Sequence, residues 1–84
     1  MTSKEFAKAL RTHLKKTDPR LANISVTIGK GTARSWVSIR GSLEFGYFTT
    51  DEKNALNERG ILCGFNNASL DWQDQDHLVK KLGL

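Results

Sequence analysis

Three side chains in the segment 24–40 have the chemistry to contact a nucleic acid: Arg34, Trp36 and Arg40. Successive side chains of a strand point to opposite faces of a sheet. The alternation in this segment therefore predicts a β-hairpin whose core face carries Ile24, Val26, Ile28, Val37 and Ile39. The three candidate residues then share the other face. An indole flanked by two guanidiniums suits stacking on bases and contact with phosphates.

The alternative is that a helix crosses to this face and buries Trp36 beneath an arginine stem.

Gly29 and Gly31 predict the hairpin turn, because glycine takes the positive φ that tight turns need. Lys30 then stands at the tip, where it can touch phosphate. The string Gly-Lys-Gly-Thr lacks the earlier glycine of a phosphate-binding loop and joins two strands, so we expect no nucleotide site there.

A second group of candidates follows the helix predicted over 3–16. Thr2 and Glu5 form a capping box, and Phe6, Leu10 and Leu14 form a buried stripe. At 100° per residue, four cations fall within about 60° of arc away from this stripe. These cations are Lys4, Lys8, Arg11 and Lys15. They could follow a phosphate backbone, and the alternative is an ordinary solvated helix face.

The charge balance divides the chain. Residues 1–40 carry nine Lys and Arg against two acids, a net of +7, whereas residues 41–84 carry four against seven, a net of −3. The basic half favours an acidic partner, or else the charges only aid solubility. No apolar run approaches the ~20 residues of a membrane span, and the first residues lack a secretory signal. We expect a cytoplasmic protein with no membrane partner.

The remaining residue types that could do chemistry have plainer interpretations. Asp71, Asp74 and Asp76 complement the dipole of a helix predicted over 70–82, and with His77 they lack the spacing of a metal site. The lone Cys63 is interpreted as a small buried hydrophobe. We therefore expect no metal, no cofactor and no enzymatic activity.

The elements that position these residues predict one α+β domain over 1–84. Strands are predicted over 23–29, 33–40 and 43–48, and a helix capped by Thr49 and Glu52 runs to Arg59. Residues 61–65 fit either a buried strand or a core segment, and 66–67 a turn. The expected order is α-β-β-β-α-(β)-α, a three-stranded antiparallel meander with helices on one face.

We expect a single core. Its predicted members are Phe6, Leu10, Leu14, Ile24, Val26, Ile28, Val37, Ile39, Phe45, Leu56, Ile61, Leu62, Phe65, Leu78 and Leu82. Trp72 is predicted to share the packed face of the last helix.

The α-β-β-β-α order resembles double-stranded-RNA-binding domains and the small HicA-type toxin ribonucleases, over roughly residues 3–60. The first family places lysines where this chain has Thr50-Asp51-Glu52-Lys53, and the second places a catalytic histidine where Thr32 and Ala33 follow Gly31. Residues 29–39 and the later Phe-Thr-Thr-Asp-Glu-Lys are also similar to small phage and mobile-element proteins. That resemblance implies no activity, but it favours an accessory protein that engages or inhibits a host machine.

Two functions are therefore expected from sequence. The first is a non-enzymatic module that binds DNA or RNA, single strands included, through the eight cationic and aromatic candidates: Lys4, Lys8, Arg11, Lys15, Lys30, Arg34, Trp36 and Arg40. The alternative is a protein-interaction module, either a homodimer or a phage or mobile-element accessory protein that binds a host protein.

Overall fold

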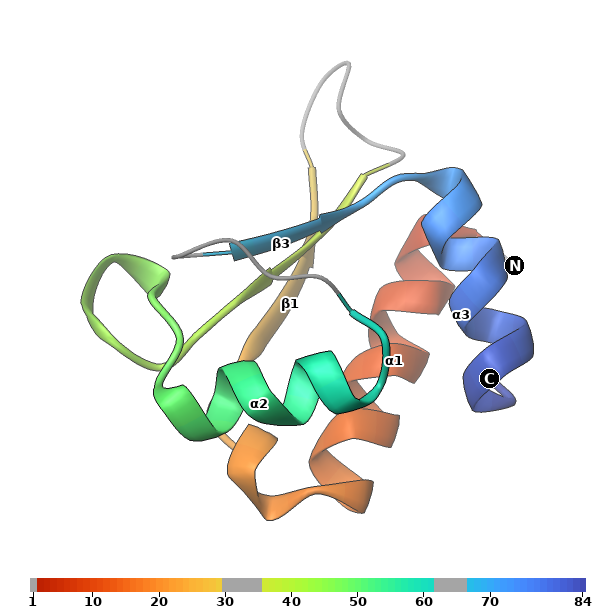
Figure 1. Cartoon of the computed structure of the whole chain (residues 1–84). Helices are drawn as coiled ribbons and strands as arrows, with labels where there is room; N and C mark the ends of the chain where they lie inside the picture. Colours follow the sequence, from red (N-terminus) through yellow and green to blue (C-terminus); the bar gives the residue numbers. More distant parts are fainter. Residues whose placement is uncertain (1, 30–35, 62–66) are drawn as a thin grey trace.

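The computed structural model describes residues 2–29, 36–61 and 67–84, and Figure 1 shows how they are arranged. The elements are α1 (Ser3–Thr17), the 3-10 turn η1 (Pro19–Leu21), β1 (Ser25–Ile28), β2 (Val37–Arg40), the 3-10 turn η3 (Glu44–Gly46), α2 (Thr50–Glu58), β3 (Asn67–Leu70) and α3 (Trp72–Leu82). The α+β class and the three-stranded antiparallel sheet are confirmed, with strands in the order β1-β2-β3. The chain order is α-β-β-α-β-α.

All three α-helices begin at capping boxes. Thr2 with Glu5, Thr49 with Glu52 and Asp71 with Asp74 each exchange side-chain and backbone hydrogen bonds. These bonds satisfy amide donors that the first helical turn leaves without partners. At the other end of α3, Gly83 takes a left-handed conformation with φ 70°, which glycine adopts without steric cost. The helix boundaries lie within two residues of those predicted.

Buried side chains collect on one face of the sheet, between the strands and the helices. Figure 1 shows α1 and α3 side by side on that face. The sheet contributes Val26, Val37, Ile39, Ala68 and Leu70 to the core, and α1 contributes Phe6, Ala7, Leu10 and Leu14. The opposite face carries hydroxyl side chains of Ser25, Thr27, Ser38 and Ser69. In the described ranges, no helix is long and apolar enough to span a bilayer.

The third strand is not where the sequence predicted it. Residues 43–48 alternate like a strand, but the chain there forms η3, and Phe45 (φ 61°) and Gly46 (φ 80°) are left-handed. Such residues cannot continue an extended strand. The third strand is instead β3, where Ala68 and Leu70 face the core on either side of Ser69. Its partner in the register is β2, which pairs Val37 with Leu70.

Two predicted core residues, and one residue of the predicted packed face of the last helix, are exposed instead. Ile28 is 41% exposed at the end of an edge strand, Phe45 is 74% exposed on the η3 turn, and Trp72 is 67% exposed in the first turn of α3. Leu82 is only partly buried. Core members that the sequence did not indicate include Leu21, Phe48 and Ala55. The predicted hairpin turn and the predictions for Leu62, Cys63 and Phe65 lie outside the described residues.

Candidate nucleic-acid interface

The four predicted cations of the first helix form one exposed row on α1. Their positions follow from burial of the opposite face, where Phe6, Leu10 and Leu14 are essentially inaccessible. The eleven helical steps from the first to the last of them, at 1.5 Å each, give the row a length of about 16 Å. Among the described residues, no acid forms an ion pair with any of the four. We call Lys4, Lys8, Arg11 and Lys15 the cation row.

The cation row borders a groove between α1 and β1 of about 510 Å³. Its apolar lining comes from Ala7, Val26 and Ile28, and its charged lining comes from Lys4, Lys8, Arg11 and Glu5. Glu5 accepts a hydrogen bond from the Thr2 backbone N–H at 3.1 Å, and this bond lowers the pKa of its carboxyl group. The groove thus combines an apolar floor with a rim that is mainly cationic.

Trp36 lies on the other side of the sheet from this groove. Its backbone carbonyl accepts from the Gly29 N–H at 2.9 Å, so it sits opposite Gly29, one residue beyond the Ile28–Val37 end of the β1–β2 pairing. Its side chain is 43% exposed. Of the two alternatives that the sequence left open for Trp36, exposed or buried, the structure shows a substantially exposed side chain. The cation row and Trp36 do not share one flat surface, because β1 separates them.

Arg40 shares a face with Trp36 but is held at the opposite end of β2. Four residues of strand separate the two by about 13 Å. The Arg40 guanidinium donates to the Phe45 carbonyl at 3.0 Å, and it lies so close to Gly46 that a Cβ there would collide with it. The predicted arrangement of one indole flanked by guanidiniums is thus not assembled by Trp36 and Arg40. Arg34 and Lys30 lie outside the described residues.

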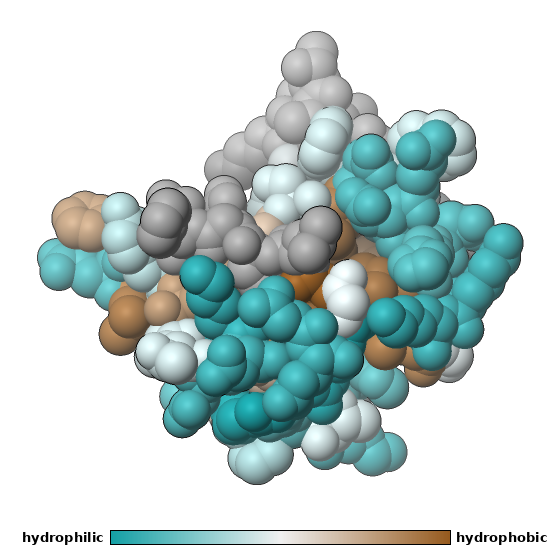
Figure 2. Space-filling view, viewed as in Figure 1, coloured by the Kyte–Doolittle hydropathy of each residue, from teal (hydrophilic) through white to brown (hydrophobic). Residues whose placement is uncertain are grey.

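The loop that holds Arg40 is a compact structure in its own right, and we call residues 41–48 the aromatic loop. The Gly41 N–H donates to the Gly46 carbonyl and the Leu43 N–H donates to the Tyr47 carbonyl. The rings of Phe45 and Tyr47 lie 6.5 Å apart. Leu43, Phe45 and Tyr47 are each about half exposed or more, and Figure 2 shows hydrophobic residues at the left margin, over this loop.

Glu52 fastens the aromatic loop to α2. One of its carboxylate oxygens accepts from the Thr49 N–H at 2.9 Å and from the Ser42 N–H at 3.2 Å. Burial opposes ionisation of this carboxyl, but the bonds from Thr49 and Ser42 outweigh it and lower its pKa. The sequence indicated the capping box but contained no local signal for the bond to Ser42, which lies ten residues away.

A cluster of charged side chains that the sequence did not indicate joins η1 to α2. Asp18 is only 5% exposed; it accepts a forked pair of bonds from Arg20 and contacts Arg59 at 3.1 Å. Arg20 also contacts Glu58 at 2.6 Å. The bonds from Arg20 hold the pKa of Asp18 well below its ordinary value, although burial opposes this shift. Arg20 and Arg59 therefore act in the fold and are not free for a polyanion.

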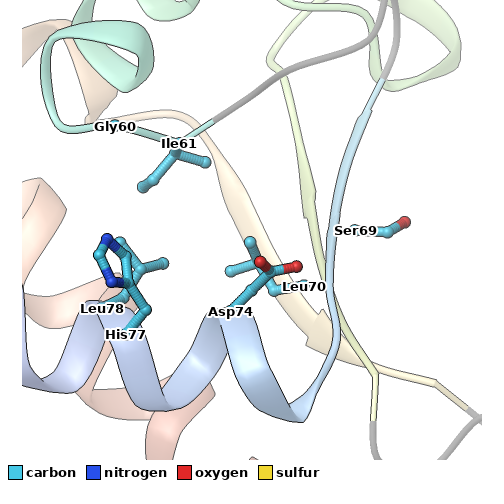
Figure 3. A pocket seen from close by; sticks show the side chains of 7 residues that line it. All are labelled: Gly60, Ile61, Ser69, Leu70, Asp74, His77 and Leu78. Carbon is cyan, nitrogen blue, oxygen red and sulfur yellow. The ribbon is translucent and has the colours of Figure 1, made fainter.

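Asp74 and His77 of α3 line a small pocket. Figure 3 shows Asp74 and His77 on the side of α3 that faces Ile61. Its volume is about 210 Å³, below the ~300–1,000 Å³ of ordinary ligand sites. Asp74 forms the capping box of α3 with Asp71, as its predicted role requires. No group of three or more potential metal ligands occurs in the described part of the chain.

The comparisons with known proteins add no assignment. No protein-family model matches the chain, and neither a curated protein nor a solved structure matches it. The resemblance to double-stranded-RNA-binding domains and HicA-type toxins depended on an α-β-β-β-α order that the structure does not have. It carries no argument about function. The candidate interface is therefore judged on its own geometry.

Proposed function

We propose that this chain is a non-enzymatic nucleic-acid-binding module that contacts phosphates through the cation row. The observation that supports the proposal is the placement of four exposed cations along one side of α1, beside an apolar groove. Lysine and arginine rows bind phosphates with little sequence preference and release counterions as they do so. Trp36 and Arg40 on the outer face stay secondary candidates.

Reversal of two central charges tests the proposal. We expect Lys8→Glu/Arg11→Glu to weaken binding of a short DNA or RNA. With four phosphates neutralised, log affinity should fall with log salt with a slope of about −3 to −4, and the double variant should roughly halve that slope. Fluorescence anisotropy at several salt concentrations measures both quantities.

A matched control separates the cation row from total charge. Lys53→Glu/Lys80→Glu makes the same change in net charge. Each reversal from a cation to glutamate lowers the charge by two units, so both double variants bring the net charge from +4 to 0. We expect this control to retain most of the affinity and the steep salt slope. Equal losses in the two double variants, or no binding by the unmodified chain, would contradict the proposal.

Trp36→Ala tests whether the outer face takes part. If a base stacks on the indole, the substitution should cost about 1–3 kcal/mol of binding free energy with little change in salt slope. An unchanged affinity would confine the interface to the α1 side of the sheet. Trp72 is 67% exposed as well, so the fluorescence of Trp36, which is 43% exposed, reports contact only in a Trp72→Phe background.

A protein-interaction role is the second candidate, and the aromatic loop favours it. Three exposed apolar or aromatic side chains on one hydrogen-bonded loop are the kind of rigid group that forms interface hot spots. The partner that can be tested directly is a second copy of the chain. Sedimentation velocity over a range of concentrations should show self-association that Phe45→Asn abolishes; a monomer at all concentrations argues against the homodimer.

A further inference from the structure

The β1 edge of the sheet offers unused backbone hydrogen-bonding groups. In an antiparallel pair, only alternate residues direct their N–H and C=O groups at the partner strand. The bond from the Gly29 N–H to the Trp36 carbonyl makes these two residues a hydrogen-bonded pair. By the same alternation, Ser25 and Thr27 also point their backbone groups at β2. The N–H and C=O groups of Val26 and Ile28 therefore point outward, where no other strand of the described sheet pairs with them.

These two residues also form the floor of the groove beside α1. Their side chains line it together with Ala7. The facing side carries three cations, Lys4, Lys8 and Arg11, and one acid, Glu5. One narrow surface thus presents cations on one wall, apolar side chains at the bottom and outward backbone N–H and C=O groups along the other wall. Each part matches a different part of a nucleotide: phosphate, base face and base edge.

Resting on the proposed function, we infer that the groove binds unpaired nucleotides, so that the ligand is single-stranded nucleic acid. Phosphates contact the cation row, a base lies over Val26 and Ile28, and the base edge exchanges hydrogen bonds with the outward N–H and C=O groups of β1. In a duplex, the bases are stacked and their pairing edges are occupied. A duplex can therefore reach the cations of the rim but cannot place a base on the floor.

An extended peptide that adds to β1 as a fourth strand is the competing occupant. Pairing with Val26 and Ile28 would satisfy the same backbone groups. Such a peptide would need acidic side chains at alternate positions to meet the cations on α1, because alternate residues face the groove. A nucleic acid supplies a negative charge at every residue, which fits the continuous cation row. The observations therefore favour the nucleic acid.

The test compares labelled dT12 with a 12-base-pair duplex of mixed sequence, using anisotropy at matched salt. We expect the single strand to bind at least ~10-fold more tightly, which is about 1.4 kcal/mol. We expect Ile28→Pro, which deletes one outward N–H, to weaken dT12 binding by about 2- to 10-fold. Its salt slope should stay unchanged, because no phosphate contact is lost.

Ser69→Pro is the matched control on the opposite edge of the sheet. Ser69 pairs with Ser38 in the register, and its N–H points outward from β3 by the same alternation. The Ser69→Pro variant should therefore bind dT12 as tightly as the unmodified chain does. Circular dichroism checks that both proline variants fold. If Ile28→Pro does not fold, amide hydrogen exchange of the unmodified chain replaces it: bound dT12 should protect the Val26 and Ile28 amides but not the Ser69 amide.

The outcomes separate the two proposals. Equal affinity for duplex and single strand overturns the groove inference and leaves nucleic-acid binding standing, whereas no binding of either overturns both. Unchanged dT12 affinity in folded Ile28→Pro, or no protection of Val26 and Ile28, also overturns the inference. So does saturable binding of an alternating Glu-Val peptide that dT12 cannot displace.

Discussion

Phe45 has a backbone conformation that poorly suits its side chain. Its φ of 61° is left-handed, and such a conformation costs a bulky residue about 1–2 kcal/mol. Its side chain regains little of this, since it is 74% exposed. The surrounding bonds from Gly46 to Leu43 and from Tyr47 to Glu44 keep the turn in place. Phe45 thus weakens the free fold while it presents a ring to solvent.

Replacement of Phe45 by asparagine should therefore stabilise the protein. Asparagine tolerates the left-handed region, and the Arg40 bond goes to the Phe45 backbone, so the substitution retains it. We expect Phe45→Asn to raise the free energy of unfolding by about 0.5–1 kcal/mol, measured by urea denaturation. Leu43→Asn is the control, because Leu43 has an ordinary φ of −78° and should give no gain. A destabilised Phe45→Asn would show that the ring packs more than its exposure indicates.

At the scale of elements, local sequence patterns placed the helices well, but the alternation of apolar residues did not show which segment forms the third strand. Capping boxes and apolar periodicity lie within a few residues of each helix, so α1, α2 and α3 could be placed from sequence. The alternation of 43–48 is equally clear but has no partner strand. Which alternating segment joins the sheet depends on contacts across tens of residues, and β3 takes that place beside β2.

The same distinction applies to the candidate site. The cation row follows from helix periodicity alone, and the face on which Trp36 lies follows from strand parity. Its exposure depends on whether a helix covers that face, which the sequence left open. The bond from Arg40 to Phe45 depends on the turn η3, where the alternation of residues 43–48 wrongly predicted a strand. The groove depends on the packing of α1 against β1, which no local pattern specifies.

The aromatic loop closes only because Gly41 has no side chain. A Cβ at this position would collide with the Tyr47 carbonyl and the Phe48 backbone. We expect Gly41→Ala to lower the free energy of unfolding by about 1–3 kcal/mol. The amide chemical shifts of residues 41–48 in the NMR spectrum should change as the loop opens. Gly83→Ala is the contrasting variant: a Cβ there meets nothing within 4 Å, and the cost should be only the ~1 kcal/mol of a left-handed alanine. A well-folded, fully stable Gly41→Ala would contradict this account.

For the whole molecule, we expect the free energy of unfolding to fall at low pH. Hydrogen bonds and ion pairs lower the pKa values of Asp18 and Glu58, and hydrogen bonds that outweigh burial lower that of Glu52. Their ordinary pKa values are 3.8 for aspartate and 4.5 for glutamate. A carboxyl whose pKa is lower in the folded state stabilises the fold above its unfolded pKa and loses that contribution as pH falls through the folded value.

We therefore expect stability to be level near neutral pH and to fall progressively once the pH drops below about 4.5. Urea midpoints at pH 7, 5 and 3 measure this. Asp18→Asn should be less stable at pH 7, and its decline between pH 5 and 3 should be shallower, because it has lost the most strongly shifted carboxyl. An identical decline in both proteins would show that Asp18 does not carry the effect.

The position of β3 in the chain has a consequence for how the protein folds. β1 and β2 pair residues 9 to 15 positions apart, whereas β2 and β3 pair residues 27 to 33 positions apart, with α2 between them. Bringing β2 and β3 together closes the longer segment and therefore costs more chain entropy before any stabilising contact forms. The hairpin and α1 can thus form an early nucleus, and docking of the last strand completes the sheet.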